Sequence, residues 1–115
     1  MQEKRKYVRV RCNLITSFKE TGGGDPKFFS SEASIEDVSV GGARIRIGKF
    51  IPLTSRVIVR FNFPGRRELL VPMAPIWFYE LPSGHRYEVG GRFVDMSDGA
   101  RMEIESYVRE SLGKK

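Results

Sequence analysis

Residues 37–47 read DVSVGGARIRI, and this stretch decides the fold class. Its two adjacent glycines, Gly41 and Gly42, favour a tight turn because glycine adopts backbone angles that other residues avoid. Apolar and charged residues then alternate from 43 to 47, as in a strand with one face on a core and the other in solvent. The stretch therefore predicts a turn that leads into a half-buried β-strand.

The chain on both sides of this stretch is divided in the same way. Short apolar-rich runs are separated by clusters of Gly, Pro, Ser and Asp, which is typical of strands joined by turns. A short turn at 64–67 predicts that the strands before and after it form a hairpin. The six predicted strands are 10–18, one from residue 28 or 29 to 38, 43–47, 57–63, 69–79 and 87–96.

Two of these strands contain residues that disturb a regular sheet. Pro72 and Pro75 lie in 69–79, and proline lacks the backbone donor that a sheet ladder uses. We therefore expect this strand at a sheet edge or with an interruption. Gly90 and Gly91 lie inside the last strand, where they predict a bulge or a close backbone approach.

An apolar stripe with a four-residue repeat predicts a helix over 97–112. Ser97 or Asp98 can cap its start, and Gly113 can end it. Six short strands and one helix predict an all-β fold, a closed or nearly closed barrel with the helix over one opening or side, because an open sheet would leave unprotected edges. The stripe consists of Ala100, Met102, Ile104, Tyr107, Val108 and Leu112.

Length and composition indicate one globular domain over 1–115. The chain has 115 residues, of which 40% are hydrophobic and 30% charged, enough for one core of ordinary size. The single cysteine, Cys12, excludes an internal disulfide. No apolar run reaches the roughly 20 residues that span a bilayer, and no apolar signal segment follows the basic N-terminus. These features predict a cytoplasmic protein without membrane insertion.

The net charge of +6 is concentrated near the N-terminus. Such a cluster attracts anions, so residues 1–9 are expected to form a flexible basic arm: a solvated tail, or one that binds phosphates, including those of DNA or RNA. Within it, Arg5 and Arg9 are spaced R-x-x-x-R, although Arg56 and Arg60 repeat this spacing inside a predicted strand. The cations of the cluster are Lys4, Arg5, Lys6, Arg9 and Arg11.

A second pattern, Asp37-x-Ser39-x-x-Gly42, is rarer by composition. A near miss occurs at 95–100, which reads DMSDGA. Taken alone, the pattern fits an Asx-type turn in which Asp37 and Ser39 satisfy backbone donors between two strands.

The two patterns in this order resemble the PilZ domain family. The alternating strand 43–47, the segment Pro75-Ile76-Trp77, the segment 90–93 (GGRF) and the C-terminal helix agree with that family in sequence order, so the resemblance extends from Lys4 to about Glu110. It implies a six-stranded antiparallel, split β-barrel with a C-terminal helix. It also implies a receptor for the bacterial second messenger cyclic di-GMP, without catalytic activity, metal or cofactor.

The resemblance also implies which residues bind the ligand. Arginine grips phosphate with two parallel hydrogen bonds and also forks onto or stacks on guanine, and a carboxylate suits the donors of guanine's Watson–Crick edge. On binding, the basic arm would order over the barrel and present a surface to an unidentified partner protein. The implied binding residues are Arg5, Arg9, Asp37, Ser39 and Gly42, with Gly41, Arg44 and Lys4 as additions; Lys4 stands where some family members carry a further arginine.

Three other functions fit the sequence less well. An enzyme is disfavoured, because His85 is the one histidine and neither it nor Cys12 sits in a catalytic or zinc-binding pattern. A family member without ligand, acting as a protein-interaction module, is disfavoured because both patterns are present.

A barrel that binds single-stranded nucleic acid is the main rival, since it fits the charge. A single-strand binder needs aromatic and basic residues on one face. Arg44 and Arg46 share a face with no aromatic residue between them, so this rival ranks below the receptor. The aromatic residues expected in the core are Phe61, Phe63, Trp77 and Phe93.

Overall fold

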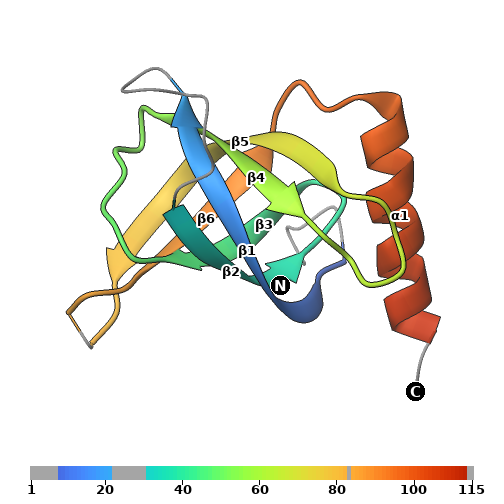
Figure 1. Ribbon diagram of the computed structural model, residues 1–115, viewed down its shortest axis with the longest axis horizontal. Coiled ribbons are helices and arrows are strands. Elements are labelled where there is room, and N and C mark those ends of the chain that lie inside the picture. Colours follow the sequence, from blue (N-terminus) through green and yellow to red (C-terminus); the bar gives the residue numbers. More distant parts are fainter. Residues whose placement is uncertain (1–7, 22–30, 83, 114–115) are drawn as a thin grey trace, which may run out of the picture.

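The computed structural model describes residues 8–21, 31–82 and 84–113. Within them, six antiparallel strands close into a barrel in the order β1-β2-β3-β6-β5-β4 (Figure 1). The predicted all-β barrel with one C-terminal helix is therefore confirmed. The elements are β1 (Val10–Thr21), β2 (Ser31–Val38), β3 (Gly42–Ile47), β4 (Arg56–Phe61), β5 (Leu69–Glu80), β6 (Tyr87–Phe93) and α1 (Asp98–Gly113).

Three strand ends differ from the sequence prediction by two or three residues. β4 ends at Phe61 instead of Phe63. β1 continues three residues past Phe18 because its end pairs with β4, Thr21 standing opposite Arg56. β6 ends at Phe93 instead of Met96. The chain leaves the ladder there, since Asp95 has a positive φ of 51°. The predicted start of the second strand, at residue 28 or 29, lies outside the described residues.

β5 is not an edge strand, so that part of the prediction is wrong. It pairs with β4 on one side and β6 on the other, because the barrel has closed. The predicted interruption is present as a register shift between Pro75 and Trp77, opposite Gly90 and Gly91. The predicted close backbone approach is also present: a Cβ on Gly91 would lie 2.8 Å from the Ala74 carbonyl oxygen.

The barrel interior holds the apolar half of the alternating strands. Burying one such side chain fully contributes about 1.5–3 kcal/mol, so the interior supplies most of the driving force for folding. The side chains that are almost completely buried include Phe18, Ile35, Ile45, Val59, Phe61 and Met73.

α1 lies beside one end of the barrel, next to the β4–β5 connection (Figure 1). The Ser97 hydroxyl accepts a hydrogen bond from the Ala100 amide at 3.1 Å, which confirms the predicted cap. Tyr107 stacks on Phe63 with ring centroids 3.9 Å apart. The prediction that Met102 and Leu112 belong to the apolar stripe is wrong, because these side chains are 66% and 49% exposed. No helix in the described part of the chain is long and apolar enough to cross a membrane.

Candidate functional site

The turn between β2 and β3 is held by Ser39. Its hydroxyl accepts hydrogen bonds from the amides of Gly41 and Gly42, both at 3.2 Å, and its own amide donates to the Gly42 carbonyl at 2.8 Å. The side chain is almost fully buried, with Ser39 5% exposed. In this structure the hydroxyl is therefore used to close the turn.

The turn is also tied tightly to β6. The Phe93 amide donates to the Gly41 carbonyl at 2.9 Å. A Cβ on Gly42 would lie 2.2 Å from the Gly91 carbonyl oxygen, a distance that real Cβ atoms do not show. Glycine is therefore required at position 42 by the approach of two backbones.

Asp37 lies at the end of β2, where two arginines from other strands or segments meet it. Arg9 Nη1 donates to Asp37 Oδ1 at 2.7 Å, and Arg44 Nε donates to Oδ2 at 2.8 Å. Such charge-assisted bonds are short and strong. Asp37 is 8% exposed, and both of its oxygens are engaged. A guanine edge would have to share this carboxylate with the arginines or displace one of them.

A second carboxylate, Glu88 on β6, continues the network. Arg44 Nη1 donates to Glu88 Oε2 at 2.8 Å, and Arg46 Nε donates to the same oxygen at 3.1 Å. The Tyr79 hydroxyl donates to Oε1 at 3.0 Å. These contacts complete an ion-pair chain, Arg9–Asp37–Arg44–Glu88–Arg46, that runs across the outer face of the barrel.

The ion-pair chain lowers the pKa of its acid Glu88 and raises the pKa values of Arg44 and Tyr79. Burial works against the charged form of Glu88, but hydrogen bonds from Arg46 and Tyr79 and the nearby arginine charges hold its pKa below its ordinary value. Burial likewise opposes the charged form of Arg44, but Asp37 and Glu88 raise its pKa. The hydrogen bond to Glu88 raises the pKa of Tyr79. The shifts of Glu88 and Arg44 therefore both favour the charged form of the side chain.

Strand register aligns this network with an exposed aromatic residue. Asp37 stands opposite Arg44, Arg44 opposite Gly90, and Gly90 opposite Trp77. Trp77 is 37% exposed and stacks on Tyr79, with centroids 5.9 Å apart. Gly90 stands between Arg44 and Trp77, and because it has no side chain the Trp77 ring can cover it; a Cβ there would lie 2.2 Å from the ring.

The expectation that Trp77 belongs to the core is therefore wrong. The register shift after Pro75 changes which residues of β5 face outward, so alternation along the sequence indicated the wrong face. Phe61 and Phe63 are buried as expected, and Phe93 is half-buried. As expected, no aromatic residue lies between Arg44 and Arg46 on β3. However, β5 supplies Trp77 and Tyr79 to the same outer face of the barrel.

The structure brings Arg9, Asp37 and Arg44 together and places the turn of Ser39, Gly41 and Gly42 beside them. Arg5 and Lys4 lie outside the described residues. Sequence reasoning missed Glu88, Arg46, Tyr79 and Trp77. Glu88 carried a usable signal, since it is a lone acid in the alternating stretch of β6 and so had to face outward, where β3 already placed two arginines.

The Arg9 side chain is partly exposed, but one of its donors is buried without a partner. Its Nε has no hydrogen-bond acceptor among the described residues. A buried guanidinium donor without a partner is costly to the folded state.

The surroundings of Cys12 disfavour ionisation of its thiol. Burial, together with the charges of Asp37 and Glu36, raises the pKa of the Cys12 thiol to about 12. A thiol that stays protonated is a poor nucleophile. No group of three or more His, Cys, Asp and Glu residues that could hold a metal ion occurs among the residues with described positions.

Comparison with known proteins agrees with the fold. The family model of the PilZ domain matches residues 3–110. The inhibitor of motility MotI/DgrA of Bacillus subtilis superposes with a TM-score of 0.73 at 16% identity, over 99% of this chain and 54% of that one. MrkH of K. pneumonia, in complex with c-di-GMP, gives 0.68 at 13% identity, over 96% and 53%.

The PilZ domain of YcgR from Escherichia coli, solved with c-di-GMP, gives a TM-score of 0.62 at 17% identity, over 98% of this chain and 100% of that one. This chain thus spans about half the length of MotI and MrkH and the whole of the YcgR domain. No curated protein matches the sequence significantly. At these identities the structural likeness concerns the fold.

Proposed function

Because the chain belongs to the PilZ domain family, we propose that it is a receptor domain for cyclic di-GMP in the bacterial cytoplasm, and that 1–115 acts as one unit. The observation that carries the proposal is the convergence of Arg9 and Arg44 on Asp37, beside the turn that Ser39 closes. The YcgR domain and MrkH, which share the fold, have been solved with c-di-GMP.

The chemistry of the outer face suits a dinucleotide with two phosphates and two guanines. The side chains of Arg9 and Arg44 are 28% and 26% exposed, so each keeps donors in reach of solvent. A guanidinium can bind a phosphate with two bonds or fork onto guanine O6 and N7. The exposed ring of Trp77, on the same row, offers a flat surface to a purine.

Asp37 has a double role in this proposal. Before the ligand arrives, Asp37 holds the two arginines in place. When one arginine turns toward a phosphate, the freed carboxylate oxygen accepts hydrogen bonds from a guanine edge. Such preorganisation lowers the entropic cost of binding, because the side chains that contact the ligand are already ordered.

Arg5 and Lys4 complete the site from the basic arm in this proposal. Ligand binding would draw the arm over the barrel, and the ordered arm would present a new surface to a partner protein. Amide hydrogen exchange of residues 1–11 measures this step. Saturating cyclic di-GMP should slow that exchange, and unchanged exchange with bound ligand would contradict arm ordering.

Isothermal titration of the protein with cyclic di-GMP tests the proposed function. We expect micromolar or tighter binding, no binding of GTP, and loss of binding in Arg9→Ala. Arg109→Ala, which removes an exposed arginine on α1, is the matched control and should bind as the wild type does. A folded protein that gives no heat and no change in melting temperature would overturn the proposal.

Binding of single-stranded nucleic acid is the second candidate, because Trp77 and Tyr79 share the outer face with Arg44 and Arg46. Such binding would weaken steeply with salt. Titration of a thymidine oligonucleotide at two salt concentrations separates the two functions. Salt-sensitive binding tighter than that of cyclic di-GMP would favour nucleic acid.

A further inference from the structure

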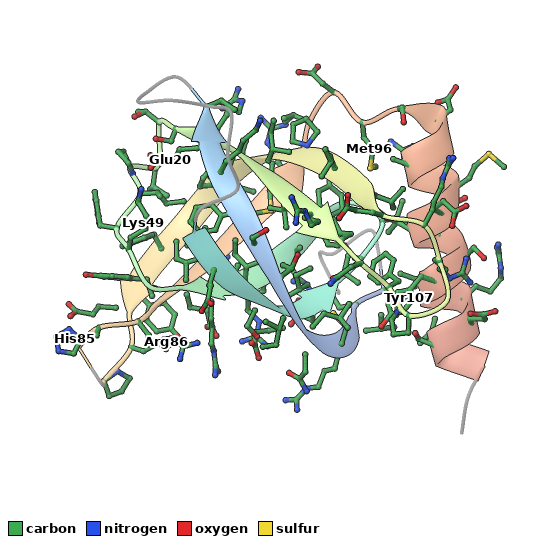
Figure 2. The ribbon with its side chains drawn as sticks, viewed as in Figure 1. Glu20, Lys49, His85, Arg86, Met96 and Tyr107 are labelled. Atoms are coloured by element: carbon green, nitrogen blue, oxygen red, sulfur yellow. The ribbon has the colours of Figure 1, made fainter. Side chains whose placement is uncertain are left out.

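A groove of about 530 Å³ opens on the outer face of the barrel, beside the ion-pair chain. Its walls come from β1, β2 and β3, from the loop after β3, and from the turn between β5 and β6. In Figure 2, Lys49 and Arg86 lie at the end of the barrel opposite α1. The lining residues that matter for recognition are Ile15, Glu32, Ser34, Arg46, Lys49 and Arg86.

Strand register fixes the position of the groove relative to the candidate site. Ile15 stands opposite Ser34, and Ser34 opposite Arg46. This row lies two to three residues along the strands from the row of Asp37 and Arg44, which is about 7–10 Å. Arg46 belongs to both regions, since it lines the groove and also donates to Glu88. The groove is therefore a neighbour of the candidate ligand site, and Arg46 is the described residue that the two regions share.

The charge of the groove is strongly positive. Three of its lining residues, Arg46, Lys49 and Arg86, are cations, against the single acid Glu32. The side chains of Arg46 and Lys49 are 41% and 50% exposed. Lys49 pairs with Glu20 at 2.9 Å, but an exposed pair of this kind contributes at most about 1 kcal/mol. An incoming carboxylate can therefore compete for Lys49 at small cost, whereas Arg46 stays bonded to the buried Glu88 through its Nε.

The groove also has an apolar contact point. Ile15 is 73% exposed, more than any other large hydrophobic residue described. It sits on the outer face of β1, where water covers it in the isolated domain. An aliphatic side chain placed on Ile15 would remove both from water and contribute about 25 cal/mol per Å² of apolar surface buried.

We propose that this groove docks an acidic segment of a partner protein that carries an aliphatic residue between its carboxylates. Arg46, Lys49 and Arg86 bind the carboxylates, and Ile15 packs against the aliphatic side chain. Glu32 accepts a backbone amide of the segment. The same features disfavour nucleic acid, because none of the residues that line the groove is an aromatic base-stacking platform, whereas Ile15 offers a contact for an aliphatic side chain.

The test is an NMR titration of the full chain, without cyclic di-GMP, with the capped peptide Glu-Leu-Glu-Glu-Leu-Glu. We expect amide shifts centred on Ile15, Ser34 and Arg46. The double variant Lys49→Glu, Arg86→Glu should bind the peptide at least about tenfold more weakly. The matched double variant Arg101→Glu, Arg109→Glu changes the net charge equally on α1 and should bind as the wild type does.

Three results would overturn the proposal: no shifts at the groove with millimolar peptide, equal weakening in the two double variants, or stronger groove shifts with hexathymidylate than with the peptide. The peptide in which Lys replaces Glu should cause no groove shifts. Because cyclic di-GMP is absent, failure of the proposed receptor function would leave this result unaffected, and failure of peptide docking would leave the receptor function unaffected.

Discussion

The chain contains two Asp-x-Ser stretches, at 37–39 and 95–97, and they behave alike in one respect and differently in another. Both serines close a turn: Ser39 accepts from the Gly41 and Gly42 amides, and Ser97 accepts from the Ala100 amide at the start of α1. The acids differ. Asp37 is 8% exposed and bonded to two arginines, whereas Asp95 is exposed, with a φ of 51°.

The difference lies in what other parts of the chain bring to each acid. Arg9 comes from the segment before β1, Arg44 from β3, and Glu88 from β6 extends the network. The three-residue pattern thus stabilises a turn at both places. It belongs to a candidate ligand site only at Asp37, where arginines from other parts of the chain bond to the carboxylate. Matched substitutions at the two stretches test whether this difference in surroundings has consequences for stability and binding.

The largest effect is expected at the last position of the pattern. Gly42→Ala places a Cβ against the Gly91 carbonyl and should lower the free energy of unfolding by about 2–3 kcal/mol. In the second stretch the last position already holds Ala100; Gly99→Ala, one position earlier, meets only Arg67 Nη2 at 3.7 Å and should be neutral or slightly stabilising in a helix. Urea denaturation measures both. Equal effects would show that the close approach of β3 and β6 is not rigid.

The second-largest difference in stability is expected between the Asp37 and Asp95 variants. Asp37→Asn leaves Arg9 and Arg44 without their carboxylate and should cost about 1–3 kcal/mol of stability. Asp95→Asn should change stability by less than about 0.5 kcal/mol, because the residue is exposed and asparagine tolerates a positive φ. The same urea titrations apply. A neutral Asp37→Asn would mean that the ion pairs do not support the fold.

The serines should be nearly equal. Ser39→Ala and Ser97→Ala each remove a hydroxyl that caps backbone amides, at about 1 kcal/mol each. Thermal unfolding of the two variants is the measurement. If Ser39→Ala is as stable as Ser97→Ala but no longer binds cyclic di-GMP, its hydroxyl contacts the ligand as well as closing the turn.

The smallest effect concerns pH and the extension of the network to Glu88. Its pKa is held below the ordinary 4.5, so its contribution to stability is present above that value and is lost as the pH falls through the lower, folded-state pKa. The stability difference between wild type and Glu88→Gln should therefore shrink as the pH is lowered from 5 through the folded-state pKa of Glu88, which lies below 4.5. A difference that stays constant over this window would contradict the role of the Glu88 charge.

The sequence predicted the fold because its signals are local. Alternation in 43–47, the Gly41–Gly42 turn and the cap at Ser97 each depend on neighbours in the chain, and the structure confirms them. The bulge after Pro75 is different, since it depends on how β5 meets β6. Trp77 is therefore expected in the core by alternation alone, although it lies on the outer face.

The candidate site was predictable in part for the same reason. Asp37, Arg9 and Arg44 are indicated by motifs, but the use of both Asp37 oxygens by arginines could not be read from spacing. Arg46 and Glu88 were missed because their pairing joins β3 to β6 across more than forty residues of sequence. Leu112 keeps the helical repeat yet lies past the end of the barrel contact and is exposed.

We propose that the first Asp-x-Ser stretch, and not the second, belongs to a cyclic di-GMP site. Calorimetric titration of Asp37→Asn beside Asp95→Asn tests it most directly, because both variants remove one carboxylate from the same local pattern. We expect Asp37→Asn to weaken binding at least about tenfold, or about 1.4 kcal/mol, and Asp95→Asn to bind as the wild type does. Wild-type affinity in both folded variants would contradict the account.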